Sequence, residues 1–146
     1  MNYKKFNFGF SLLELLVVIS IIGILVSISA AAFNVAQRTS RDSRRRADIK
    51  AMQDAFEQYM AENTSYAACS TMATYDSGSG PLLPSGLPVD PRNSGSFVYN
   101  TATGCDDTGY CVCAYLEGSS GNADAPTGAS CNYTAGGDYY CLTNLQ

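Results

Sequence analysis

The chain has 146 residues, a formal net charge of −4, six cysteines and no histidine. This length accommodates one small domain and one membrane anchor. Without histidine, neither a Ser-His-Asp nor a Cys-His nucleophile system can be built, so we do not expect an enzyme. The acidity is concentrated in residues 63–146, which carry seven carboxylates and one arginine and are therefore a poor nonspecific ligand for nucleic acid.

The first predicted segment is a short leader, residues 1–9, which contains two lysines and ends at Gly9. An apolar, helix-compatible stretch follows at residues 10–33. It exceeds the roughly 20 residues that a membrane-spanning helix requires. Glu14 is the one charged side chain in this stretch. Because a carboxylate in hydrocarbon costs roughly 2.5 to 3.5 kcal/mol even on lenient scales, we expect a partner to offset its charge.

Residues 34–62 are expected to continue the same helix as an amphipathic half, since no proline interrupts the sequence before Pro81. Apolar side chains recur here at steps of three, four and three, which places them on one helix face. This stripe consists of Ile49, Met52, Phe56 and Tyr59. We expect the C-terminal part of the chain to pack on the stripe.

A run of arginines at residues 38–46 lies just beyond the apolar stretch. The positive-inside rule alone would orient the span with this run in the cytoplasm, whereas the cysteines described below favour the opposite orientation. We interpret the run as a solvated or inter-subunit charged face that is partly paired with Asp42 and Asp48. The alternative is a patch for anionic lipid headgroups or DNA. Its members would be Arg41, Arg44, Arg45 and Arg46.

Residues 63–146 are rich in Gly, Ser, Thr, Asn and Pro, with short apolar and aromatic runs between turns. Three runs are typical of strands in one antiparallel sheet: residues 96–100, 110–117 and 138–144. A sheet this small needs support, so we expect it to lie across the helix stripe and to be stapled by disulfides. The predicted fold class is α+β, with a long N-terminal helix packed against a small periplasmic or extracellular sheet domain.

All six cysteines follow the apolar stretch. They are Cys69, Cys105, Cys111, Cys113, Cys131 and Cys141. This density indicates a disulfide framework formed outside the cytoplasm, and six cysteines allow 15 complete pairings. Cys111 and Cys113 would point to the same side of one strand, so each is expected to bond to a different segment. A zinc site is the rival interpretation. The lack of histidine and the single residue between these two cysteines disfavour it.

We expect no cofactor. Acid-bearing loops are weak candidates for calcium binding, because carboxylate oxygens suit a hard cation. These candidates are Asp106, Asp107, Asp124 and Asp138. Since no EF-hand spacing is present, solvated surface acids are the default interpretation.

The stretch "GFSLLELLVVISIIGIL" (residues 9–25) resembles the prepilin signal of type IV pilins and type II secretion pseudopilins. The shared features are a basic leader, a glycine, a phenylalanine and a long apolar helix with glutamate four residues after that phenylalanine. The resemblance implies a pilin-like fold, cleavage by prepilin peptidase after Gly9, and N-methylation of Phe10. It also implies that Glu14 accepts the amine of Phe10 from a neighbouring subunit during filament assembly.

On this resemblance the protein is a structural subunit of a type IV pilus-like filament. Its partners would be copies of itself or related subunits, the prepilin peptidase, and a pilus or secretion assembly platform. Membrane lipid would surround the apolar span in the cytoplasmic membrane before assembly, and the filament would lie at the cell surface or in the periplasm. Nucleic acid is not an expected partner.

Two alternatives stay open. One is a pseudopilin of a type II secretion system, although a disulfide-dense domain suits a surface pilus better. The other is a membrane-anchored or secreted binding domain that does not polymerise. In the secreted case a signal peptide would be removed near the alanines at residues 30–32, and the mature chain would begin at Ala31 or Phe33 instead of Phe10.

Overall fold

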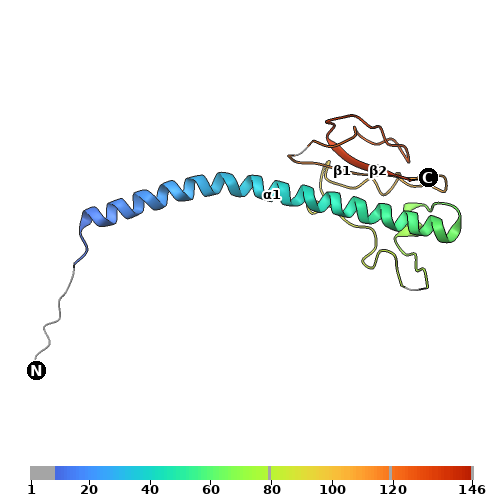
Figure 1. Ribbon diagram of the computed structural model, residues 1–146, viewed down its shortest axis with the longest axis horizontal. Coiled ribbons are helices and arrows are strands. Elements are labelled where there is room, and N and C mark those ends of the chain that lie inside the picture. The colour runs from blue at the N-terminus through green and yellow to red at the C-terminus, as the bar shows by residue number, and fades with distance from the viewer. Residues whose placement is uncertain (1–8, 79, 119, 146) are drawn as a thin grey trace, which may run out of the picture. The chain divides into compact units, whose positions relative to one another are not determined.

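A computed structural model describes residues 9–78, 80–118 and 120–145 (Figure 1). Its elements in chain order are helix α1 (Leu12–Asn63), the short helix α2 (Cys69–Met72), and strands β1 (Cys111–Tyr115) and β2 (Tyr139–Thr143). The chain divides into two compact units, Met1–Gln37 and Arg38–Gln146. The α+β prediction is confirmed. The predicted leader lies outside the described residues except for Gly9.

The part of α1 in the first unit is exposed throughout and mostly apolar, with Glu14 as its one charged side chain. By length and composition α1 is able to cross a membrane. The hydroxyl groups of three serines in it, Ser20, Ser27 and Ser29, each donate to a main-chain carbonyl of the preceding turn at 2.8 Å. Such internal satisfaction is what a helix in hydrocarbon requires.

The part of α1 in the second unit buries one face. The side chains of Ile49, Met52 and Phe56 are fully buried in the main core, and Tyr59 is half-buried at its border. The ring of Phe56 stacks on that of Tyr110, with centroids 4.6 Å apart. The helix stripe therefore lies against the residues that lead into and form β1.

The sheet has two antiparallel strands, not the three that the sequence predicted. β1 and β2 pair so that Cys113 lies opposite Cys141. Residues 96–100 do not form a strand. Instead, the side-chain amide of Asn100 takes the place of strand backbone: it donates to the carbonyl of Cys111 at 2.6 Å and accepts from the amide of Cys113 at 2.7 Å. A side chain has thus replaced the predicted strand at the outer edge of β1.

The outer edge of β2 is covered in the same way. The Asn122 amide donates to the carbonyl of Cys141 at 2.9 Å and accepts from its N–H at 2.7 Å. Backbone beside Asn122 approaches the start of β2 very closely, and the N–H of Gly121 donates to the carbonyl of Gly137 at 2.7 Å. A Cβ atom at Gly121 would overlap the carbonyl group of Tyr139, so this approach requires glycine.

Three disulfides staple the C-terminal unit. They are Cys69–Cys105, Cys111–Cys131 and Cys113–Cys141. Cys111 and Cys113 bond to different segments, as their positions on one strand face predicted. Because a two-stranded sheet is marginal alone, these cross-links and the packing on α1 stabilise it jointly.

Candidate functional site

The N-terminus of α1 is built by a capping box formed by Ser11 and Glu14. The N–H of Ser11 donates to Oε2 of Glu14 at 2.9 Å, and the N–H of Leu13 donates to Oγ of Ser11 at 3.2 Å. The first turn of a helix has main-chain donors without intrahelical partners, and this exchange satisfies two of them. The Ser-x-x-Glu spacing was the signal for this arrangement, and the sequence reasoning above overlooked it.

The structure places Gly9 and Phe10 immediately before this box. Both residues are exposed and precede the first helical residue, and the Phe10 side chain is 86% exposed. The peptide bond between them therefore lies in non-helical backbone, where a peptidase reaches it without unwinding α1. Phe10 and Glu14 lie on either side of the helix start, which is at Leu12.

The apolar side chains after Phe10 form a continuous exposed surface. The large apolar side chains from Phe10 to Val35 are exposed, with relative accessible areas between 46% and 88%. Monomeric soluble proteins rarely expose apolar patches of more than a few hundred Å², so this surface requires a cover of lipid or of other apolar helices. Glu14 lies within it, where an acid needs a specific reason to be present.

A second polar site lies within the Arg38–Gln146 unit, between α1 and the segments that pack on it, and Arg45 is at its centre. Its side chain is fully buried. The guanidinium donates to both carboxylate oxygens of Asp90 at 2.6 and 3.1 Å, and to Oδ1 of Asp42 at 2.8 Å. It lies 2.9 Å from Oε1 of Glu117. Burial opposes the charge of Arg45, but the hydrogen bonds to the three carboxylates outweigh it and raise its pKa.

Glu117, just after β1, joins this cluster to the neighbouring helix turn. Nε and Nη2 of Arg41 donate to its two carboxylate oxygens at 2.7 and 2.6 Å. The Arg41 hydrogen bonds, with help from Arg45 and against the cost of burial, lower the pKa of Glu117 to about 2. The carboxylate of Asp42 accepts hydrogen bonds from the main-chain N–H groups of Glu117 and Gly118 at 2.9 and 3.0 Å. The segment after β1 is thus held to α1 by a network of charge-assisted hydrogen bonds.

This network confirms the expected pairing of the arginine run with Asp42 and corrects the interpretation of Arg45 as part of a solvated or inter-subunit face. Arg45 and Arg41 bind carboxylates within the same unit. Arg44 keeps the predicted exposure, with 68% of its side chain accessible and a loose contact of 3.9 Å to Asp48. Arg46 donates to the carbonyl of Ser120 at 3.1 Å. The burial of Arg45 was not predicted from the sequence. A charged residue is almost never fully buried unless it is paired, and the partners Asp90 and Glu117 are distant from Arg45 in sequence.

The calcium candidates are all exposed, and two of them, Asp106 and Asp107, are neighbours in one loop. Asp106 accepts from the N–H groups of Thr108 and Gly109 at 2.9 and 3.0 Å, and these hydrogen bonds, together with that from the Thr108 hydroxyl, lower its pKa. Asp124 accepts from the Thr134 hydroxyl at 2.8 Å. Among the described residues, no three of these carboxylates come together at one point.

Comparison with known sequences gives one match, which covers the N-terminal segment. Residues 4–30 match the prokaryotic N-terminal methylation motif. No curated protein and no solved structure matches the chain. The motif is the prepilin-type signal of type IV pilins and pseudopilins, so the chain carries the signal of a pilin-like or pseudopilin-like protein.

Proposed function

We propose that the protein is a structural subunit of a type IV pilus-like filament. The observation that carries the proposal is the exposed apolar half of α1, with Glu14 inside it and the N-terminal methylation motif across its start. A membrane covers such a helix before assembly, and equivalent helices of other subunits cover it afterwards. The C-terminal unit, with its three disulfides, would form the outer surface of the filament.

Processing begins at the bond between Gly9 and Phe10. Prepilin peptidase would cleave it on the cytoplasmic side, and Phe10 would become the N-methylated first residue. The exposed, non-helical backbone at these residues supports this step, since the substrate of a peptidase must be extended at the scissile bond. A cytoplasmic motor ATPase and an assembly platform, both implied by the motif, would then move the subunit into the filament.

Glu14 would determine the register between neighbouring subunits. Its carboxylate would accept the charged amine of Phe10 from the next subunit as the apolar helices pack. A carboxylate has about four acceptor positions, so the bond from Ser11 leaves room for this amine. A buried charge without its partner costs about 3 to 5 kcal/mol, so subunits packed out of register are disfavoured by about this amount.

Glu14→Gln tests the assembly role, because glutamine preserves a capping box but carries no charge. We expect cleavage after Gly9 to continue and the yield of sheared filaments to fall at least about 100-fold, since each 1.4 kcal/mol is a factor of ten. Ser11→Ala is the matched control, because it disturbs the cap and leaves the charge. Normal filament yield from Glu14→Gln would contradict the proposal.

The N-terminal residue of the mature chain separates this proposal from a secreted binding domain. Mass spectrometry should find N-methylated Phe10, whereas a chain that begins at Ala31 or Phe33 would mean that the apolar helix is discarded. A type II secretion pseudopilin shares the processing and the packing. Electron microscopy of purified surface filaments with peptide identification distinguishes it, because a pseudopilus would leave no such filaments and its loss would block protein secretion.

A further inference from the structure

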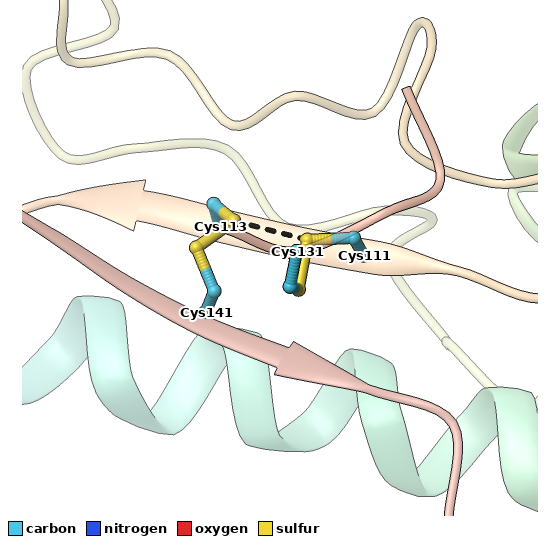
Figure 2. A group of neighbouring side chains, drawn as sticks. All are labelled: Cys111, Cys113, Cys131 and Cys141. Atoms are coloured by element: carbon cyan, nitrogen blue, oxygen red, sulfur yellow. Dashed lines mark hydrogen bonds between the residues drawn. A yellow bond between two sulfur atoms is a disulfide. The ribbon is translucent and has the colours of Figure 1, made fainter. Parts of the chain in front are cut away.

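Four cysteines gather beside the sheet (Figure 2). The Sγ atoms of Cys111, Cys113, Cys131 and Cys141 all lie within 4.8 Å of one another. They form two disulfides, and the sulfurs of Cys111 and Cys113 are 3.5 Å apart, so the two cross-links are in contact. Three of the four side chains are buried, and Cys131 is half-buried. The third disulfide, which contains Cys69, is not part of this group.

Hydrogen bonds of the main chain and of two asparagine side chains also hold these positions. Cys113 and Cys141 are direct partners in the pairing of β1 with β2. The side chains of Asn100 and Asn122 bind the backbone of three of these cysteines from the two outer edges. The loop that carries Cys131 is tied by the hydrogen bond from the N–H of Asp124 to the carbonyl of Asn132, at 3.0 Å. Hydrogen bonds, in addition to the disulfides, thus hold the four sulfur-bearing residues beside one another.

We propose that these four cysteines, when reduced, form a tetrathiolate site for a thiophilic divalent cation such as Zn²⁺. Four thiolates about 2.3 Å from a tetrahedral zinc ion lie roughly 3.8 Å from one another. The sulfurs of Cys111 and Cys113 already have nearly this separation. The spacing of one residue, which disfavours zinc in the sequence, suits this site because alternate residues of a strand share a face.

The chemistry has two steps. Two equivalents of a dithiol or phosphine reductant supply four electrons. The four protons come from the dithiol, which becomes a disulfide, or from water, whose oxygen passes to the phosphine, and the two disulfides become four thiols. The cation then replaces the four thiol protons, which pass to solvent, and four metal–sulfur bonds form. In the oxidised chain no thiolate exists and no ion binds. The same four atoms therefore act as staples outside the cell and as a metal site wherever the folded chain meets a reductant.

The test uses the full-length chain in detergent micelles, reduced with a phosphine, with Co²⁺ as an optical probe and Zn²⁺ as competitor. The reduced chain should bind one Co²⁺ with the charge-transfer absorption of four sulfur ligands, which Zn²⁺ abolishes. The oxidised chain should bind none. A ratio other than one ion per chain, or a spectrum of fewer sulfur ligands, would overturn the proposal.

Two variants with equal thiol content separate a built site from adventitious chelation. The double variant C69S/C105S retains the four clustered thiols, and C111S/C131S retains four thiols that do not converge. We expect the first to bind as the reduced parent does. The second should bind at least about 100-fold more weakly, since even the loss of an outer-shell partner costs 10- to 100-fold. Equal binding by both variants, or binding by neither, would overturn the proposal.

Discussion

Replacing Arg45 with methionine is expected to destabilise the Arg38–Gln146 unit by about 3 to 5 kcal/mol. Methionine occupies part of the buried volume but removes every hydrogen bond of the guanidinium. Asp42 and Glu117 keep other donors, on the segment after β1 and on Arg41. Asp90 keeps one, the N–H of Arg92 at 2.8 Å, among the hydrogen bonds of the described residues. Because the side chain of Asp90 is fully buried, most of the loss arises there.

Urea unfolding of the full-length chain in micelles measures this loss. Nine of the ten tyrosines lie after residue 58, so near-ultraviolet circular dichroism reports the C-terminal unit. The matched control is Arg44→Met, one position earlier on the helix. Its side chain is 68% exposed and its ion pair is loose, so we expect a change of at most about 0.5 kcal/mol.

A second substitution identifies the source of the loss. Asp90→Asn removes the buried charge that Arg45→Met leaves without its partner. The double variant should therefore be more stable than the sum of the two single losses predicts, by at least about 1.5 kcal/mol. A loss below about 1 kcal/mol in Arg45→Met, or strict additivity in the double variant, would refute the reasoning.

Two further predictions concern the same unit. Glu117 has a pKa of about 2 when folded and an ordinary value near 4.5, so the unfolded chain binds its proton more readily. The contribution of Glu117 to stability is complete above about pH 4.5 and is lost as the pH falls towards 2. In Glu117→Gln, the urea midpoint should therefore fall less between pH 4.5 and pH 2 than it does in the parent. An equal fall of the urea midpoint in both proteins would contradict the assignment. Gly121→Ala should destabilise the unit by more than about 2 kcal/mol, because the new methyl group overlaps the backbone of β2. Gly118→Ala is the control, since a Cβ there meets only an ordinary van der Waals contact. Equal urea midpoints for the two variants would contradict the prediction, because they would mean that β2 shifts to accommodate the methyl group without loss of stability.

The long helix was predictable because its signals are local. An unbroken apolar run and a period of three to four residues depend only on near neighbours in sequence. They predicted a helix from residue 10 to 62, and α1 extends from Leu12 to Asn63. The Ser11–Glu14 box, which accounts for the later start, was also readable from spacing alone.

The polar interactions were not predictable, because they depend on partners far away in sequence. Arg45 binds Asp90, 45 residues later, and Arg41 binds Glu117, 76 residues later. Each arginine taken alone is typical of a solvated face. The predicted strand at residues 96–100 was wrong for the same reason. The run has a high β-propensity, but the side chain of Asn100 at its end binds the main-chain groups at the edge of β1 that a strand would otherwise bind. Such a replacement leaves no periodic signal.

The asparagine side chains at the two sheet edges have a consequence for how the sheet can associate with another chain. An open strand edge is a template for edge-to-edge aggregation and for strand exchange between neighbours. Here Asn100 and Asn122 occupy those positions beside the cysteines of β1 and β2. Growth by strand addition is thereby blocked at these points. A second chain would have to displace an asparagine side chain before it could add a strand at either of these points.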